Sequence, residues 1–468
     1  MKEQKKFHFP GTCALLFMII IIATILTWII PAGKFDTEKV GNITRVIPGT
    51  FHFIERTPQG IWAVFNAVVI GFFKSSKMMT MIMFVGAAVY LLEKTKTIEL
   101  VFTKLTKSKN INDTFIVFAI MLFMTIGGAA GVFANATVAL IPIGILLTTA
   151  MGLDKASGFL MVYLGAYSGF NVGWANSATL AVAHPIAELP IFSGFNVRVI
   201  IHIINFIFNF IFVMWYIKSI RKDSTKSLNY EEGMKPEDYM GLHIDAEDKK
   251  EELTWKHIIS LIATFIAIGI ILIGATKYGW SNDHFSTTFF MLALFIGIIH
   301  GLGLNGTIQM FLKGCASMLN AAFIVGFANG ISVILADGNI LSTIVYALSI
   351  PMEKMGTIIG ANFMFVANLI INLFIPSGSG QAAAVMPIMV PVADLAGITR
   401  QVAVQAFQFG DGFSNCIYPT AGTLMGSLGI AGIAWNRYAK KFLPLIIVQI
   451  IFSFVCLTIL QSIGWTGL

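Results

Sequence analysis

The chain has 468 residues, of which 56% are hydrophobic and only 12% are charged. An ordinary soluble domain carries about 25% charged residues, so this composition excludes a water-soluble globule, a disordered chain and a small disulfide-rich scaffold. Several apolar runs reach the roughly 20 residues that a helix needs to cross a bilayer. The sequence therefore predicts an all-α polytopic membrane protein.

The net charge of +7 comes largely from basic residues that gather in a few short segments. Cytoplasmic loops of membrane proteins carry an excess of Lys and Arg, so these clusters indicate topology rather than a nucleic-acid partner. They occupy residues 2–6, 94–109, 218–226 and 437–441. The cysteines lie in apolar segments without the spacing of a metal or redox pair, and no chemistry is assigned to Cys13, Cys315, Cys416 and Cys456.

Placing the basic clusters inside predicts about nine crossings. The first apolar run is longer than a usual signal-peptide core and is followed by a poor cleavage site, so it is predicted to be a transmembrane helix. The crossings are 13–31, 61–93, 156–185, 197–217, 256–275, 287–303, 316–336, 399–431 and 442–461. Residues 36–58 are expected to form an external loop, and 219–255 a charged cytoplasmic linker. The N-terminus is then cytoplasmic and the C-terminus external.

Two further apolar stretches, 113–153 and 361–397, are predicted to be re-entrant hairpins because their flanks lie on the same side. The middle of the first, 127–137, is rich in Gly and small residues, and the second has Pro-Ser-Gly-Ser-Gly-Gln at its tip, 376–381. Such backbone is tolerated in a membrane only where protein or a water-filled cavity satisfies its polar groups.

The two halves of the chain share an ordered series of residues. Ala139, Pro142, Ile143, Gly152, Lys155 and Gly165 recur 245 residues later as Ala384, Pro387, Ile388, Gly397, Arg400 and Gly410. The first hairpin is entered from inside and the second from outside, which indicates an inverted-topology repeat, 1–218 and 256–468 joined by the linker. This arrangement is typical of secondary transporters; the alternative is a chance match between Gly- and Ala-rich helices.

Each repeat also contains a crossing that Gly, Pro and polar residues interrupt. We expect unwound segments at 168–179, within 156–185, and at 410–420, within 399–431. Unwinding frees carbonyl groups for cations, and the N-termini of half-helices offer N–H groups to anions. The alternative is that these small polar residues hold helices together.

The candidate substrate- or ion-binding residues lie at the two tips and the two interruptions. They are Asn135, Thr137, Ser168, Asn171, Asn176, Ser177, Thr179, Ser377, Gly378, Ser379, Gly380, Gln381, Asp411, Ser414, Asn415 and Thr420. A Na⁺ ion is a candidate near Asn135, Asn171, Ser379 and Asn415, and coupling to Na⁺ or H⁺ is the only cofactor-like requirement expected.

Asp411 is the sharpest of these candidates. A carboxylate in mid-membrane costs about 3 kcal/mol and usually faces a cavity in which it has a function. It can pair with a cationic substrate group, hold Na⁺ or relay a proton; a structural role is the alternative. Gly410-Asp411 is similar to the GxGD motif of intramembrane aspartyl proteases, but Gln408 occupies the first Gly position, and a serine protease reading of Gly378-Ser379-Gly380 lacks a partner His. Neither an enzyme nor a channel is favoured.

Several of these segments closely resemble the YfcC-type branch of the DcuC-like carriers. The resemblance covers nearly the whole chain and rests on 28–33, 375–381, 386–388, 406–415 and 419–420. It implies the ion transporter superfamily fold, with a scaffold domain, a mobile transport domain that holds both hairpins, and a homodimer in a bacterial inner membrane. Members include four-carbon dicarboxylate carriers and basic amino acid antiporters of the arginine/ornithine type.

The choice between these substrates depends on charge at the site. No Lys or Arg falls inside either tip or interruption, whereas Asp411 does. The sequence therefore favours an exchanger of amino acids, of the basic amino acid type, that works by alternating access. The alternative is a Na⁺- or H⁺-coupled carrier of four-carbon dicarboxylates or other organic anions.

Overall fold

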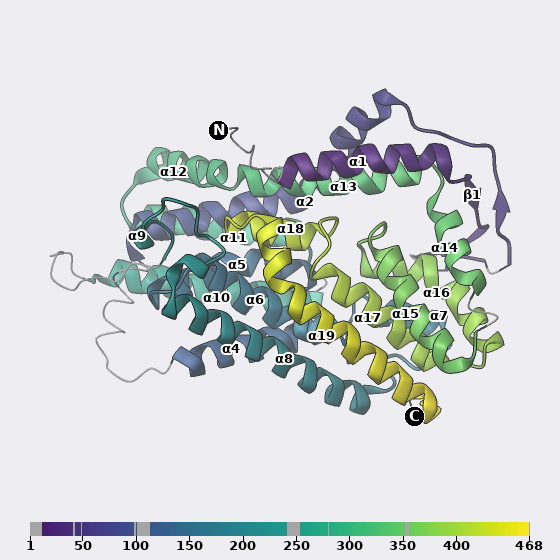
Figure 1. The fold of residues 1–468 in the computed structure, drawn as a ribbon. Helices are drawn as coiled ribbons and strands as arrows, with labels where there is room; N and C mark the ends of the chain where they lie inside the picture. The colour runs from purple at the N-terminus through teal and green to yellow at the C-terminus, as the bar shows by residue number, and fades with distance from the viewer. Residues whose placement is uncertain are drawn as a thin grey trace, which may run out of the picture.

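The computed structural model describes residues 12–40, 43–47, 49–97, 100, 113–240, 253–278, 280–351 and 355–467. Helices make up most of the fold (Figure 1). The helices of the first half are α1 (Thr12–Ile29), α2 (Ile61–Lys94), α4 (Asp113–Ala129), α5 (Phe133–Ala150), α6 (Lys155–Phe170), α7 (Leu180–Ile186), α8 (Phe195–Lys222), η1 (Ser224–Lys226) and α9 (Pro236–Tyr239). Those of the second half are α10 (Trp255–Tyr278), α11 (Asn282–Ile299), α12 (Gly303–Ser317), α13 (Leu319–Asp337), α14 (Leu341–Ser349), α15 (Thr357–Asn372), α16 (Gly378–Leu395), α17 (Arg400–Asn415), α18 (Gly422–Ile430) and α19 (Trp435–Ser462).

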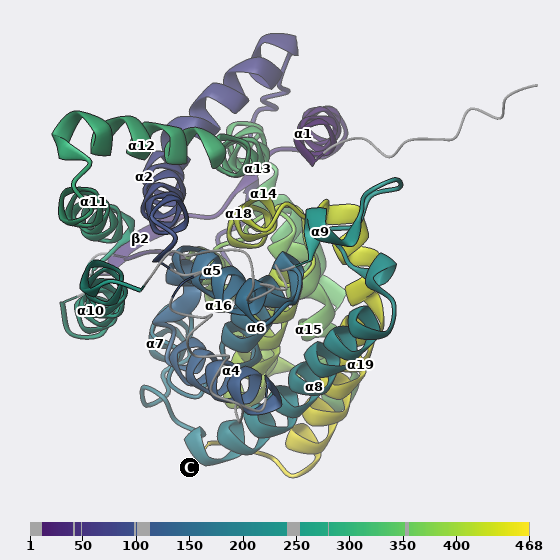
Figure 2. The same cartoon turned by 90° about the vertical axis from the view of Figure 1, so that its left-hand side faces the viewer.

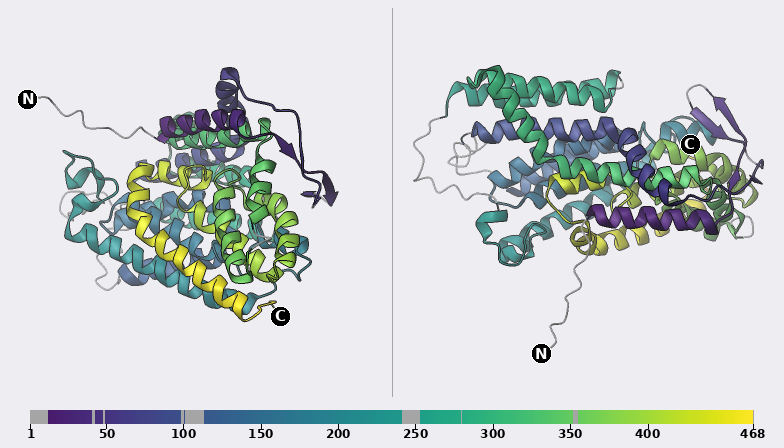
Figure 3. Two further views of the ribbon diagram at one scale, coloured as in Figure 1. Left: turned by 45° about the vertical axis from the view of Figure 1, so that its right-hand side comes forward. Right: turned by 90° about the horizontal axis from the view of Figure 1, so that it is seen from above.

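The helices form two groups that Figure 2 shows end-on. In one group α11, α12 and α13 pack on α2, and α1 packs on α13. In the other, α4 and α5 pack on α6, α15 and α16 pack on α17, and α8 and α19 lie against these two sets. Helix α18 contacts both α13 and α5, so it lies where the groups meet. Figure 3 shows the same grouping from two other directions.

The internal repeat is visible in the lengths of the elements. Helices α16 and α17 begin and end 245 residues after α5 and α6, and α19 has 28 residues, as α8 has. The N-caps match as well: the Asp154 side chain accepts from the N–H of Ser157 at the start of α6, and Thr399 accepts from that of Val402 at the start of α17. The inversion of the two copies across a membrane stays a prediction.

The second interruption does not lie where the sequence suggested. Helix α17 continues through Asn415, so 410–415 is helical and the interruption is confined to 416–421. Glycine costs a helix only about 1 kcal/mol relative to Ala, and here it permits close packing: a Cβ atom on Gly410 would lie 2.4 Å from Cβ of Asn368, on α15. The first interruption is likewise shorter than expected, because 168–170 forms the last turn of α6 and only 171–179 is non-helical.

The predicted external loop, 36–58, contains three short strands, and a fourth lies just before it. Strand β1 (Gly33–Lys34) pairs with β4 (His52–Phe53), and β2 (Thr37–Val40) pairs with β3 (Ile43–Val46), both antiparallel. Helices α12 and α14 were also not expected. The buried residues of α12, Thr307, Phe311 and Gly314, form one stripe at helical spacing, and a short amphipathic helix gives no 20-residue apolar run.

Five helices of the described chain are long and apolar enough to cross a membrane: α2, α8, α11, α13 and α19. Of the four other predicted crossings, α1 has 18 residues and α10 has 24, while α6 with α7 and α17 with α18 are interrupted. The total of nine crossings, the re-entrant character of both hairpins and the sides of the termini stay predictions.

Candidate functional site

The candidate site is organised by the crossing of α6 and α17. A Cβ atom on Gly412 would lie 2.4 Å from Cα of Asn171, at the end of α6, so only glycine allows the two backbones to approach this closely. The Nδ2 atom of Asn171 lies 3.5 Å from the Cys416 Sγ atom. The crossing places the start of the first interruption directly beside the last turn of α17.

Asp411 lies on α17 at this crossing and is fully buried. Its Oδ1 atom accepts from Asn415 Nδ2 at 3.3 Å, while Oδ2 has no hydrogen-bond partner among the described residues. A Cβ atom on Gly378 would lie 3.3 Å from Oδ2, so the free oxygen faces the first turn of α16. A buried polar atom without a partner costs about 1–3 kcal/mol, and more when it is charged. This oxygen is therefore the clearest candidate contact for a ligand.

The tip of the second hairpin meets the first interruption beside Asp411. Ser377 caps α16 by accepting from the N–H of Gly380, and Gly378 packs against the Thr179 methyl group. The first turn of a helix leaves N–H groups without partners in that helix, so this tip offers donors to a ligand. Tip and interruption are thus parts of one surface.

Gln408 connects the same surface to α6 and was missed as a site residue. Its Oε1 atom accepts from the Thr179 hydroxyl at 2.5 Å, and its Nε2 atom donates to the carbonyl of Phe170 at 2.6 Å. Gln408 lies one helical turn before Asp411 on α17, so both face the interruption. In the sequence, Gln408 is marked only by its place at the first Gly position of the GxGD-like segment.

The first interruption also contacts the tip of the first hairpin. The N–H groups of Ala175 and Ser177 donate to the carbonyls of Ala129 and Ala130 at 3.3 and 3.2 Å. Asn176 shapes the segment from within, because its Oδ1 atom accepts from the N–H groups of the two residues before α7. Both hairpin tips therefore converge on the interruption of the first repeat.

A second polar cluster lies one turn further along α17. Asn372, the last residue of α15, donates through Nδ2 to Ser414 Oγ at 2.6 Å and to Asn415 Oδ1 at 3.0 Å, while its own Oδ1 atom has no partner among the described residues. Gln381 donates to Asn368, which lies one turn earlier on α15. Asn368 and Asn372 were missed because they read as part of an apolar helix.

Four other predicted site residues, Thr137, Ser168, Ser379 and Thr420, form no hydrogen bond with Asp411 among the described residues. The Ser168 hydroxyl contacts Thr125 at 2.6 Å, in a network with His202, and donates to the carbonyl of Gly165. The Thr137 hydroxyl donates within its own helix, Ser379 is exposed on α16, and Thr420 is buried without a partner for its hydroxyl among the described residues.

The proposed Na⁺ position near Asn135, Asn171, Ser379 and Asn415 stays a prediction. Asn171 and Asn415 lie near one another at the end of α17, but no hydrogen bond between described residues joins either to Ser379. The side chain of Asn135 lies outside the described part of the chain. Within that part, no group of three His, Cys, Asp or Glu residues is suited to hold a metal ion.

Arg198 brings a cation to the first interruption from outside it, although no Lys or Arg lies within either tip or interruption. It belongs to α8, yet its fully buried guanidinium donates through NH1 to the carbonyl of Gly173 at 3.3 Å. The signal was present in the sequence, since an arginine within an apolar crossing is costly and usually functional. Arg198 lies 19 residues beyond the end of the first interruption, at Thr179, so charge within the interruption itself gives no sign of it.

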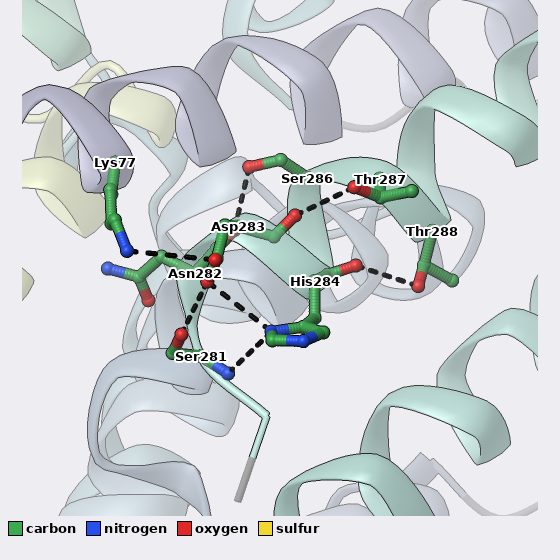
Figure 4. Close-up of polar contacts among 8 residues, drawn as sticks. All are labelled: Lys77, Ser281, Asn282, Asp283, His284, Ser286, Thr287 and Thr288. Carbon is green, nitrogen blue, oxygen red and sulfur yellow. Dashed lines mark hydrogen bonds and ion pairs between the residues drawn. The ribbon is translucent and has the colours of Figure 1, made fainter.

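Two cavities outside this site are apolar. One, of about 670 Å³, lies between α10 and α11, and the other, of about 350 Å³, involves α4, α5, α6 and α10. The polar end of the first is shown in Figure 4, where Asp283 pairs with Lys77 of α2 at 3.6 Å and His284 accepts from the N–H of Ser281 at 3.3 Å. The rest of the lining of this cavity is mainly apolar, so it suits a charged metabolite poorly.

Comparison with known proteins identifies the family. Residues 9–462 match the family described as "DcuC: C4-dicarboxylate anaerobic carrier". The chain belongs to this family. The family predicted from the sequence is thereby confirmed, and the chain is a multi-pass membrane transporter of a small molecule, consistent with the inner membrane of a bacterium. The family is one of transporters rather than enzymes.

Two relatives cover nearly the full length. The protein named "Putative basic amino acid antiporter YfcC" from Escherichia coli K12 is 28% identical over 99% of this chain and 98% of its own length. An uncharacterized protein of Haemophilus influenzae Rd is 25% identical over 95% of both chains.

Two solved transporter structures are similar at lower identity. The Alcanivorax borkumensis YdaH transporter and Neisseria gonorrhoeae MtrF, whose description concerns antimetabolite efflux pumps, are each 16% identical, with a TM-score of 0.42. They cover 98% of this chain and 100% and 96% of their own. At this TM-score we draw no conclusion from the likeness.

Proposed function

We propose that this DcuC-family transporter exchanges amino acids, with basic amino acids preferred, by alternating access of the group that contains α4–α8 and α15–α19. Asp411 carries the proposal: its Oδ2 atom is buried, lacks a partner among the described residues and faces the tip of the second hairpin. A cationic group of the substrate would satisfy this oxygen. The name of the Escherichia coli relative agrees with the same substrate class.

The convergence of both hairpin tips on one interruption supports alternating access. In secondary transporters, substrates bind near the midplane where broken helices of the two repeats meet, and one group of helices moves against the other. Here 171–179 contacts Ala129 and Ala130 of one tip and Gly378 of the other. A movement of either hairpin would therefore alter the surroundings of Asp411.

A counterflow experiment tests this function. Proteoliposomes containing the purified chain are loaded with arginine, ornithine, a neutral amino acid or succinate, and uptake of each labelled compound is measured with and without Na⁺. We expect labelled arginine to enter only when an amino acid is present inside. Uptake of arginine that needs no internal substrate would contradict exchange.

A four-carbon dicarboxylate is the second candidate, because the family description names that substrate and Arg198 is buried at the first interruption. In this case the counterflow signal would require internal succinate, and Na⁺ or H⁺ would have to offset the charge of Asp411. Accumulation of succinate without any response to arginine would favour this alternative.

A further inference from the structure

Arg198 is a buried charge without an opposite charge near it. No Asp or Glu of the described chain forms an ion pair with it, and its Nε atom has no hydrogen-bond partner there. Its neighbours are the carbonyl of Gly173, the ring of Trp465 at 5.7 Å and the Nε2 atom of His184 at 3.5 Å. Buried charges in proteins are normally paired or hydrogen-bonded in full, so this guanidinium has unused capacity for an anion.

His184 adds a second donor at the same place. Its Nδ1 atom accepts from the N–H of Phe192 at 3.1 Å, so a neutral ring carries its proton on Nε2. That N–H points toward Arg198 NH2, which is itself a donor. Two donors that face each other at 3.5 Å do not satisfy one another, but an acceptor oxygen to one side of the pair, about 3 Å from each nitrogen, would accept from both.

Gln405 is an independent indication that a polar ligand belongs here. It is fully buried, and neither its Nε2 nor its Oε1 atom has a partner among the described residues. It lies on the same face of α17 as Gln401 and Gln408, four residues after one and three before the other. Gln401 contacts Gly194, just before α8, and Gln408 contacts Gly173, so Gln405 lies between the two regions that flank Arg198.

We propose that Arg198 binds the carboxylate of the transported substrate, with His184 and Gln405 as further donors. The planar guanidinium can donate two parallel hydrogen bonds to a carboxylate. The inference rests on the proposed function, because the residues are fully enclosed and the anion reaches them only when the transport cycle opens this face. Arg198 would thus form an anion-binding subsite, which the negatively charged Asp411 cannot provide.

The two charged subsites suit a ligand with a charge at each end. Contacts lead from Arg198 through Gly173 to Gln408, then through Thr179 and Gly378 to Asp411. A basic amino acid would place its carboxylate at Arg198 and a cationic group at Asp411. A dicarboxylate would use Arg198 in the same way but would need a cation at Asp411.

The experiment measures binding to the purified full-length chain with two pairs of probes, arginine with agmatine and succinate with succinamide. Agmatine lacks the carboxylate of arginine, and succinamide replaces both carboxylates by amides. In the unaltered chain we expect arginine to bind at least about 30-fold more tightly than agmatine, the factor typical of a buried charge pair. In R198Q this preference should fall to about threefold or less, because arginine weakens and agmatine does not.

Two further variants separate recognition from folding. R198K keeps the positive charge but loses the planar guanidinium with its two parallel donors. It should therefore retain part of the preference for arginine over agmatine. R221Q is the matched control, since Arg221 lies on the same helix but pairs with Asp113 at the surface, and its preference should be unchanged. An equal loss for arginine and agmatine in R198Q, or an unchanged preference, would overturn the inference.

The succinate pair separates this inference from the proposed function. If the unaltered chain binds succinate but not arginine, the proposed amino acid function is wrong. In that case, weaker binding of succinate but not of succinamide in R198Q would still support the anion-binding subsite. If the unaltered chain binds no carboxylate probe, both proposals are wrong.

Discussion

At the residue scale, the site combines two buried groups of opposite charge that do not pair with each other in the described structure. Asp411 and Arg198 each leave an atom without a partner. Buried unpaired charges destabilise a fold, so their presence favours function over stability. Replacing Asp411 or Arg198 by a neutral residue of similar size is therefore informative, because it removes the charge and keeps most of the packing.

Asp411→Asn should weaken the binding of basic amino acids by about 30-fold or more, because the loss of one partner of a buried charge pair costs roughly 2–5 kcal/mol. A neutral amino acid should be affected far less. Isothermal titration of the purified chain with arginine, a neutral analogue and succinate measures this. Asp337→Asn is the control, since Asp337 is exposed at the end of α13.

The pattern across these ligands distinguishes the roles of Asp411. Equal losses that raised Na⁺ partly restores would indicate that the carboxylate holds Na⁺. Unchanged affinities for every ligand would return Asp411 to a structural role.

At the element scale, close approach of helices positions the site. Small residues at helix crossings let backbones pack tightly in membranes, and Gly412 does this against Asn171. The tip of α16 is different, because Ser377 and Ser379 are exposed and Gly378 between them lies against Thr179 of the first interruption. A substitution at the crossing should therefore affect stability, and one at the tip should affect transport.

Gly412→Ala should destabilise the protein by about 1–3 kcal/mol, as overpacking of a tight contact usually does. The midpoint of thermal unfolding in detergent should fall. Gly269→Ala is the matched control, since Gly269 is also helical but has no atom within 4 Å of an added Cβ. A Gly412→Ala midpoint equal to that of the control would show that α6 and α17 do not need this contact.

Ser379→Leu should abolish uptake while expression and thermal stability remain normal, because the larger side chain would occupy the space at the tip rather than disturb a packed core. Uptake in proteoliposomes and size-exclusion profiles check this. Ser462→Leu, an equivalent change at the exposed end of α19, should transport normally. Retained uptake in Ser379→Leu would place this tip residue outside the binding site.

At the scale of the whole molecule, the start of the linker contacts residues of both repeats at one end of the fold. The buried Asp154 carboxylate accepts from Ser157, Tyr216 and Ser227, and Asn229 donates to the carbonyl of Ala431 at 2.8 Å. The first part of the linker, 219–240, is thus folded against α6 and the segment after α18. The side of the membrane on which 219–240 lies therefore sets the orientation of the crossings before and after it.

Cysteine labelling tests that orientation. In a chain freed of its four native cysteines, Glu232→Cys should react with an impermeant maleimide only from the cytoplasmic side, and Thr466→Cys only from outside. Both positions are exposed in the structure, so burial would not explain a failure to react. Reaction of both cysteines from the same side would contradict the predicted odd number of crossings between residues 232 and 466.

The sequence by itself determined the class, the family and the approximate helices of this protein. Apolar length decides the class and the helices locally, because a helix needs an apolar run to cross a bilayer wherever it lies along the chain, and the motifs at 375–381 and 406–415 identify the family. The repeat of 245 residues was equally legible, since Gly and Pro recur at matched positions in helices α5 and α16, α6 and α17.

Only the tertiary structure decided which side chains meet. Gly410 and Gly412 suggested an unwound helix, but packing against Asn368 and Asn171 offsets their poor helix propensity and keeps α17 intact. Arg198 stands 25 residues after Gly173 and reaches it only because α8 folds back along α6. Gln408 likewise contacts Thr179 across 229 positions. Contacts at such separation depend on the crossing of helices, which no local pattern of residues encodes.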